Sequence, residues 1–226
     1  YEPLSLLTMI ASHTTKIKLA TAILIAPLRN PALLAKTVAT LDTISKGRLE
    51  LGVGIGWQKE EFDTAGVSFE DRSEIFWETL DICKLLWQDS PISFHGKHFN
   101  FDDIWCHPQP TQGQNLPLLF GLKMTRENAQ RISKVGHGWI PIKTSRDFIS
   151  AGKDILMEAF IKEGRQDQPR IRGQLPTCVD NNGVPNIDLT LKELEKSMAA
   201  GLDEVEVFPI NFVQSPDDIY KVLKII

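Results

Sequence analysis

The sequence has few cysteines, no long apolar run and no excess of positive charge. Three cysteines among 226 residues (Cys83, Cys106 and Cys178) are too few and too scattered for a disulfide framework or a structural zinc site. No apolar run approaches the roughly 18–20 residues that a membrane helix needs, so no membrane span is expected. A net charge of −4 gives no electrostatic case for nucleic acid. With no leader-like segment before the helix-like start at Leu4, we expect a cytoplasmic protein.

Strand-like and helix-like segments alternate along the chain, and no Gly/Ser- or Pro-rich linker divides them. A single domain over residues 1–226 is therefore expected. Helical periodicity is clearest in residues 70–87, and residues 91–101 indicate an extended excursion or hairpin. The predicted helices are Leu4–Ser12, Ala32–Ile44, Glu70–Trp87, Thr125–Val135, Arg146–Glu163, Leu189–Ala200 and Ser215–Ile226. The predicted strands are Ile17–Ile25, Arg48–Gly54, Leu116–Gly121, Gly138–Ile142, Arg170–Val179 and Glu204–Pro209.

The repeated strand–helix units indicate an α/β fold. Near-continuous apolar strands predict a parallel sheet that is covered on both faces. Six strands are two fewer than a closed eight-stranded barrel requires, and an open doubly wound sheet is the alternative.

Two stretches carry small residues at strand positions. Glycines alternate at Gly52, Gly54 and Gly56, so the backbone can approach a flat or anionic group without an intervening Cβ. Trp57 follows without the third glycine of the dinucleotide-binding pattern. A strand end that merely packs tightly is an equal alternative. Ala20 and Ala22 (and the strand around them) either admit a ring system or pack beneath a helix.

Several blocks occur in an order that resembles the bacterial luciferase-like monooxygenase family, and in particular its deazaflavin-dependent oxidoreductases. They are ATAILIAPLRNPALLAKTVATLDTISKGRLELGVGIGWQKEEFDTAGV, SFHGKHFNF, PLLFGL and GHGW. The resemblance implies a (β/α)₈ TIM barrel with its site at the C-terminal strand ends. Family members begin with a strand, a helix and a second strand before the segment equivalent to Leu4. The resemblance thus implies six of eight strands, incomplete at the N-terminus.

The resemblance assigns five residues to the ring end of a flavin-like cofactor. Ala22 and Ile23 match a pair that family members join by a cis peptide, which supports one face of the ring. Gly54, Gly56 and Glu60 match the loop beside the ring and the ribityl chain. Adjacent helical residues point about 100° apart, so we expect one of Glu60 and Glu61 to face inward and the other to face solvent. The resemblance favours Glu60 as the inward residue.

Four further residues match a turn into a helix that binds the cofactor phosphate. They are Gly121, Leu122, Lys123 and Thr125, and free N–H groups with the helix dipole suit an anion there. Leu122 or Lys123 stands where a second glycine is common, and Lys123 offers a compensating charge. His137 also departs from the family, which usually has Asp at that position.

The resemblance implies an oxidoreductase or monooxygenase that uses the deazaflavin coenzyme F-420 or FMN on a small organic substrate. The protein would position the ring and exclude water, while the cofactor supplies the chemistry. The alternative is a non-catalytic protein, either a truncated flavin-binding barrel or a relic. The sequence assigns no catalytic residue and leaves the substrate and the oligomeric state open, with a homodimer as one option.

The remaining candidates each have an ordinary explanation. His95 and His98 form an H-x-x-H pair, but an extended segment would separate the rings, so we expect no metal site. Trp57 lines the pocket or is a core aromatic. Arg29 and Asn30 touch substrate or only form a turn and a helix start.

Overall fold

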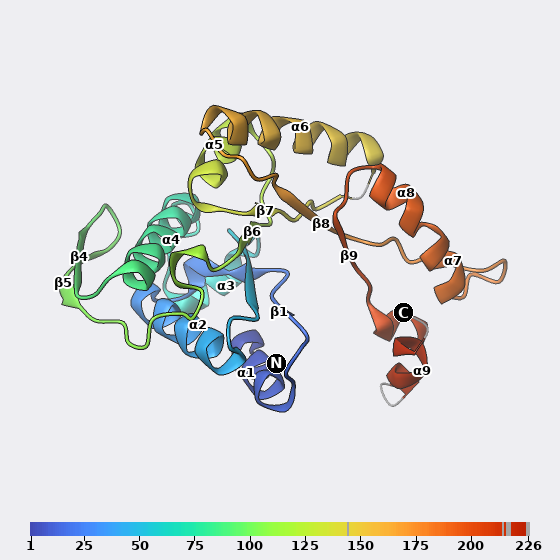
Figure 1. Ribbon diagram of the computed structural model, residues 1–226, viewed down its shortest axis with the longest axis horizontal. Helices are drawn as coiled ribbons and strands as arrows, with labels where there is room; N and C mark the ends of the chain where they lie inside the picture. The colour runs from blue at the N-terminus through green and yellow to red at the C-terminus, as the bar shows by residue number, and fades with distance from the viewer. Residues whose placement is uncertain (144, 214, 216–217, 225–226) are drawn as a thin grey trace. The chain divides into compact units, whose positions relative to one another are not determined.

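The computed structural model describes residues 1–143, 145–213, 215 and 218–224. The chain divides into two compact units, Tyr1–Gly121 and Leu122–Ile226. Both are built from strands and helices in alternation, as Figure 1 shows.

The first unit contains six helical segments and six strands among its described residues. Its helices are α1 (Pro3–His13), η1 (Ala26–Leu28), α2 (Pro31–Ser45), α3 (Lys59–Ala65), α4 (Arg72–Gln88) and η2 (Gly113–Asn115). Its strands are β1 (Leu19–Ala20), β2 (Leu24–Ile25), β3 (Leu49–Gly54), β4 (Ile92–His95), β5 (Asn100–Ile104) and β6 (Leu118–Phe120).

The second unit continues the alternation. Its helices are α5 (Arg126–Val135), α6 (Arg146–Lys162), α7 (Ile187–Lys192), α8 (Leu194–Ala199), η3 (Pro209–Phe212) and α9 (Ile219–Leu223). Its strands are β7 (Gly138–Trp139), β8 (Arg170–Gln174) and β9 (Glu204–Glu206).

Strand β3 is the centre of the sheet in the first unit. It pairs in parallel with β1, β2 and β6, and all six of its residues are buried. One of them is Glu50, whose carboxylate accepts a hydrogen bond of 2.7 Å from Lys18 Nζ. Burial of a charged group is tolerated here because an opposite charge compensates it.

Helix α2 packs against α1 and α4. Asn30 is the N-cap of α2: its side chain accepts a hydrogen bond from the Leu33 N–H at 3.1 Å, and Pro31 follows at the first helical position. The indole N–H of Trp87 in α4 donates to the Ala35 carbonyl at 3.0 Å. The apolar stripe predicted for α4 is confirmed, since its members from residue 75 to 87 are buried.

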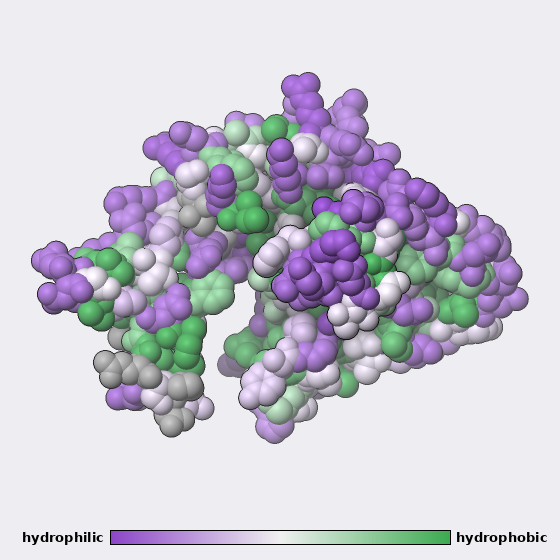
Figure 2. Space-filling model, turned by 180° about the vertical axis from the view of Figure 1, so that it is seen from behind, coloured by the Kyte–Doolittle hydropathy of each residue, from purple (hydrophilic) through white to green (hydrophobic). Residues whose placement is uncertain are grey.

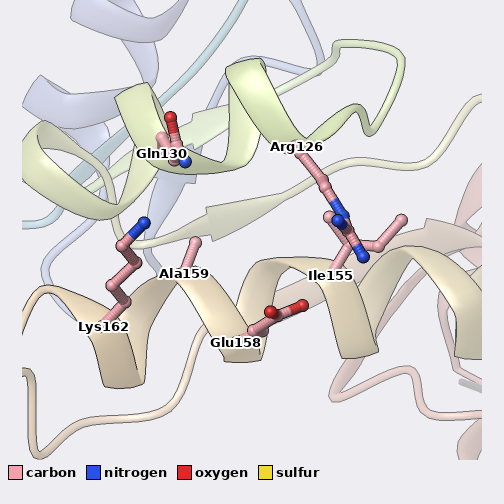
Figure 3. Close-up of a pocket in the computed structure, with 6 residues that line it drawn as sticks. All are labelled: Arg126, Gln130, Ile155, Glu158, Ala159 and Lys162. Atoms are coloured by element: carbon pink, nitrogen blue, oxygen red, sulfur yellow. The ribbon is translucent and has the colours of Figure 1, made fainter.

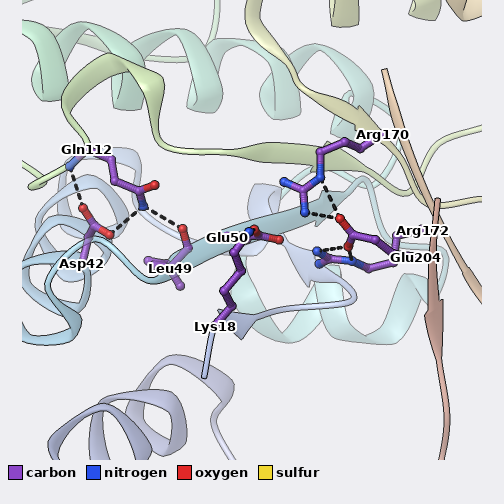
Figure 4. Close-up of polar contacts among 8 residues, drawn as sticks. All are labelled: Lys18, Asp42, Leu49, Glu50, Gln112, Arg170, Arg172 and Glu204. Carbon is purple, nitrogen blue, oxygen red and sulfur yellow. Dashed lines mark hydrogen bonds and ion pairs between the residues drawn. The ribbon is translucent and has the colours of Figure 1, made fainter. Parts of the chain in front are cut away.

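A buried carboxylate joins α2 to the segment before β6. Asp42 is fully buried; its Oδ2 accepts from the Gln112 backbone N–H at 3.0 Å and its Oδ1 from the Gln112 side chain at 2.8 Å. The same Gln112 amide group donates to the Leu49 carbonyl at 2.8 Å (Figure 4). These bonds fix the chain at the start of β3 and ahead of β6.

The second unit has its own parallel strands, in which β8 pairs with β7 and β9. Helices α5 and α6 pack on each other. Close packing explains two glycines. A Cβ on Gly152 would lie 2.3 Å from the Trp139 ring, and one on Gly138 would lie 2.1 Å from the Arg170 carbonyl oxygen.

Several predicted boundaries are wrong for identifiable reasons. The strand predicted at Ile17–Ile25 is divided into β1 and β2. The interruption contains the cis peptide between Ala22 and Ile23, and there the Thr21 hydroxyl donates to the Gly52 carbonyl at 2.8 Å. Prolines 141, 176 and 209 follow β7, β8 and β9 and remove a ladder donor, so these strands are shorter than predicted. The helix predicted at 189–200 is two short helices, α7 and α8. Part of the last predicted helix, 215–226, lies outside the described residues.

The hairpin prediction for residues 91–101 is confirmed by the antiparallel pair β4 and β5. The surface seen in Figure 2 carries hydrophilic residues throughout, with hydrophobic residues between them. None of the helices in the described ranges combines the length and the apolar character that crossing a membrane requires.

Candidate functional site

The ring residues of the first unit meet around one side chain. The peptide between Ala22 and Ile23 is cis, as the sequence predicts. A Cβ added to Gly54 would lie 2.1 Å from Ile23 Cδ1, and a Cβ added to Gly121 would lie 2.8 Å from Ile23 Cγ2. The Gly121 N–H donates to the Val53 carbonyl at 2.8 Å. Ile23 therefore occupies the space over two glycines at the C-terminal ends of β3 and β6, and we call these three residues the Ile23 platform.

Gly56 follows the Ile23 platform along the chain and requires glycine on two counts. Its φ is +84°, and a Cβ there would lie 2.8 Å from Ile25 Cγ2 and 2.9 Å from the Phe62 ring. The difference expected between Glu60, facing inward, and Glu61, facing solvent, is not seen, because both are exposed in the first turn of α3. The placement of Glu60 beside a cofactor stays a prediction. The helix is anchored through Phe62, which is fully buried, and this leaves both carboxylates on the solvent side.

The phosphate residues of the second unit lead into α5. Thr125 is the N-cap, because its hydroxyl accepts a hydrogen bond from Asn128 N–H at 3.1 Å. The Asn128 side chain donates to the Lys123 carbonyl at 2.9 Å. No acceptor is present among the described residues for the N–H groups of Arg126 and Glu127, as expected at the start of a helix. The predicted helix N-terminus is thus confirmed, with donors available to an anion.

Leu122 and Lys123, one of which stands where the family commonly has a second glycine, differ in their surroundings. Leu122 is 5% exposed, and its carbonyl accepts the indole N–H of Trp139 at 2.8 Å. Lys123 is exposed, and no described residue contacts its ammonium group. The buried side chain of Leu122 and the hydrogen bond to its carbonyl therefore hold the loop in place, while the ammonium group of Lys123 remains available to a ligand or to water.

A small groove lies between α5 and α6 in the second unit. Figure 3 shows its lining, with Arg126 extending towards α6 close to Ile155, and with Glu158 and Lys162 on the facing helix. Its volume is about 130 Å³. Pockets for small ligands usually measure about 300–1,000 Å³, so this groove is too small for a flavin.

Two arginines in the second unit share one carboxylate. Arg170 and Arg172 of β8 both bind Glu204 of β9, with Arg172 Nε 2.6 Å from Glu204 Oε2 (Figure 4). Glu206 lies two residues further along β9, on the same strand face. Its Oε1 is buried and no described group donates to it, and burial raises the pKa of this carboxyl. Sequence inspection did not identify this cluster, because only the β8–β9 register brings its members together.

The histidines of the hairpin do not form a pair. His98 Nε2 lies 3.0 Å from a Glu74 carboxylate oxygen, whereas His95 interacts with β5. Possible ligand atoms of Asp71, Glu74 and His98 lie within 4.8 Å of one another. The Lys97 ammonium also contacts Glu74 at 2.5 Å, and this bond lowers the pKa of the Glu74 carboxyl. The carboxylate thus already has a cationic partner, and the absence of a metal stays a prediction.

The other sequence candidates are placed as follows. Trp57 is 82% exposed, so it is not a core aromatic. Asn30 caps α2, and Arg29 forms an ion pair of 2.8 Å with Glu2. Burial opposes ionisation of Glu2, but hydrogen bonds from Ser5 and Arg29 outweigh it and lower the pKa of Glu2 to about 2.

The geometry defines a class of protein. Parallel strands are each followed by helices, and close-packed glycines stand at two adjacent C-terminal strand ends, which is the edge where α/β barrels carry their sites. The chain belongs to the luciferase-like monooxygenase family, whose sequence profile matches residues 1–183.

Curated relatives are 29–34% identical to this chain over the residues that align. An uncharacterized protein of Mycobacterium tuberculosis is 34% identical over 159 residues, which is 70% of this chain and 55% of that protein. The F420-dependent glucose-6-phosphate dehydrogenase of Kineococcus radiotolerans is 29% identical, over 77% of this chain and 51% of the relative. The FMNH₂-dependent dimethylsulfone monooxygenase of Pseudomonas putida is 30% identical, over 59% and 38%. The chain spans about half the length of the first two of these relatives.

A solved structure supports the fold. The coenzyme F420-dependent tetrahydromethanopterin reductase of Methanopyrus kandleri matches with a TM-score of 0.74 at 18% identity, over 91% of this chain and 81% of that one. The fold is that of the luciferase-like TIM-barrel enzymes, with six parallel strand positions among the described residues when β1 and β2 are counted as one. The fold prediction is therefore confirmed.

Proposed function

We propose that this chain is the cofactor-binding part of an oxidoreductase that uses the deazaflavin coenzyme F-420 or FMN on a small organic substrate. The observation that carries the proposal is the Ile23 platform, in which one aliphatic side chain covers Gly54 and Gly121 at neighbouring strand ends. The missing Cβ atoms let the Ile23 side chain lie close over both glycines, and a flat, apolar ring would pack against that side chain. Relatives that are named for F420 and for FMNH₂ support the same cofactor classes.

Each end of the cofactor has candidate residues. Ala22 and Ile23 would support one face of the ring, with Gly54, Gly56 and Glu60 on the adjoining loop. The phosphate would lie at the turn that contains the residues Gly121, Leu122, Lys123 and Thr125. It would accept hydrogen bonds from the backbone N–H groups of that turn, except that of Gly121, which is bonded to the Val53 carbonyl. A bound deazaflavin supplies hydride transfer from its ring carbon, whereas reduced FMN supplies reaction with oxygen. The exposed position of Glu60 suits contact with the solvent-facing side of the cofactor.

The decisive measurement is a spectroscopic titration of the purified chain with F-420, FMN and riboflavin. A charge-assisted hydrogen bond from the exposed Lys123 to a phosphate is worth about 1.4 kcal/mol after solvent screening, which is a factor of about ten in affinity. Lys123→Ala should therefore weaken FMN and F-420 binding about 10-fold and leave riboflavin unchanged.

Lys134→Ala is the matched control, because Lys134 is also an exposed lysine but lies in the last turn of α5, at the opposite end of the helix from the proposed phosphate site. If Lys123→Ala weakens the binding of FMN and riboflavin equally, or weakens neither, Lys123 does not contact the phosphate. If none of the three compounds binds, the proposed cofactor site is wrong and the non-catalytic alternative gains. Among cofactors that bind, the tighter one identifies the flavin class.

A further inference from the structure

A second feature of the first unit is an open cleft of about 390 Å³. It lies between η1, the segment that joins α3 to α4, and the turn of the β4–β5 hairpin. Its walls include Leu28, Arg29, Val67, Ile75, His98 and Phe99. Of these elements, η1 directly follows the C-terminal end of β2, and the segment between α3 and α4 comes after β3 along the chain. The volume is in the range that small-molecule pockets occupy.

The hairpin wall of the cleft is held by two carboxylates of α4, one helical turn apart. Glu78 accepts three backbone hydrogen bonds, from Lys97 at 2.8 Å, His98 at 2.9 Å and Phe99 at 3.2 Å. Glu74 accepts from the side chains of Lys97 and His98. Five bonds to one four-residue turn hold His98 and Phe99 in place. The wall is therefore pre-formed, which reduces the entropy that a ligand must lose on binding.

The charge in the cleft is balanced. Arg29 is the permanently charged residue in its lining, and its Nη2 lies 2.8 Å from Glu2 Oε1. A glutamate is ionised at neutral pH, and the hydrogen bonds from Ser5 and Arg29 lower the pKa of Glu2 further, to about 2. A guanidinium has five N–H donors, and Glu2 engages Nη2, so further donors remain for a ligand. The cleft thus offers hydrogen-bond donors without a net positive charge.

We infer that this cleft binds the organic substrate, and that the substrate is a small uncharged molecule with an apolar body and an oxygen acceptor. The apolar body packs on Leu28, Val67, Ile75 and Phe99, and the oxygen accepts from Arg29. This inference rests on the proposed function for its link to a reaction, but the cleft as a binding site stands on its own geometry. A carboxylate is disfavoured, because Glu2 already neutralises the charge of the guanidinium.

The test uses the cofactor-free chain and two probes, cyclohexanone as the neutral ketone and cyclohexanecarboxylate as the anion. Methyl NMR spectra report where each probe binds, since Leu28, Val67 and Ile75 supply methyl groups to the cleft. Cyclohexanone is expected to shift these methyl signals and to bind more tightly than the carboxylate. Shifts confined to other methyl groups, or tighter binding of the carboxylate, would overturn the inference.

Two variants sharpen the result. Val67→Phe fills the cleft and should weaken cyclohexanone binding at least about 5-fold, while Val184→Phe, at an exposed position of the second unit, should not change it. Glu2→Gln keeps an acceptor for the Ser5 N–H but frees the charge of Arg29. It should strengthen binding of the carboxylate about 3- to 10-fold and leave the ketone unchanged. No gain for the carboxylate would contradict the charge argument.

The same samples separate this inference from the proposed function. FMN and F-420 titrations are run on each variant. Cofactor binding without ketone binding in the cleft overturns the inference and leaves the proposed function intact. Ketone binding in the cleft without binding of either cofactor contradicts the proposed function and supports the cleft as a ligand site.

Discussion

The packing of Ile23 against Gly54 leads to a quantitative prediction. Gly54 is not among the residues with positive φ, so alanine is compatible with its backbone and the effect of Gly54→Ala is steric. The new Cβ would lie 2.1 Å from Ile23 Cδ1, about 1.3 Å closer than an ordinary contact of 3.4 Å. Ile23 must therefore move. Overpacking of this kind costs about 1–3 kcal/mol of stability.

Ile23→Val removes the clashing Cδ1 and should by itself cost about 0.5–1.5 kcal/mol. In the double variant the two changes compensate, because the added methyl group occupies the space that the lost one leaves. We expect the double variant to be at least about 1 kcal/mol more stable than the sum of the single changes predicts.

Urea denaturation followed by circular dichroism measures the four free energies of unfolding. A titration with FMN measures whether the ring support survives, and we expect Gly54→Ala to weaken FMN binding more than the double variant does. If the two single effects add within about 0.3–0.5 kcal/mol, the contact between residues 23 and 54 does not constrain either residue, and the argument for the Ile23 platform fails.

Two further predictions concern the second unit. Gly138→Ala should lower the free energy of unfolding by more than about 3 kcal/mol or prevent folding, because the new Cβ would lie 2.1 Å from the Arg170 carbonyl oxygen in the β7–β8 ladder. A denaturation midpoint close to that of the unchanged protein would disprove this prediction. Burial raises the pKa of Glu206 above its usual 4.5, so the folded state holds this proton more tightly than the unfolded state does. The resulting stability is fully present below pH 4.5 and is lost as the pH rises through the raised pKa. Glu206→Gln should therefore be more stable than the unchanged protein at pH 8 and equal to it near pH 4, and a pH-independent difference in melting temperature would contradict the assignment.

The sequence predicts the local chemistry of the first unit well. Pro31 after Asn30, the stripe along α4 and the hairpin of residues 91–101 each depend on residues that are close in the sequence, and the structure contains all three. The cis peptide at Ala22–Ile23 was predicted from the family pattern alone. No local signal marks it, because neither residue is a proline.

Contacts between distant segments could not be predicted in the same way. Glu78 holds the hairpin turn through three backbone N–H groups about 20 residues away, and its sequence context is that of an ordinary exposed helix position. The difference expected between Glu60 and Glu61 is not seen, because Phe62 is the residue of α3 that packs into the core and both carboxylates are exposed. Helical spacing gives the angle between two side chains, but it does not say which of them faces the core.

The hydrogen bonds that join Gln112 to Asp42 and Leu49 limit how many residues β3 and β6 can contain. They fix the chain at the opening of β3 and ahead of β6, and from there each strand advances about 3.3 Å per residue. The glycines at the far ends come level because Leu51 pairs with Leu118, and each strand reaches its glycine, Gly54 or Gly121, three residues later. One residue added inside β6 would bring Phe120 to the place of Gly121, and an aromatic ring would then compete with Ile23 for the same space. Changes of chain length are therefore restricted to η2 and the loops, while the strands keep their residue count.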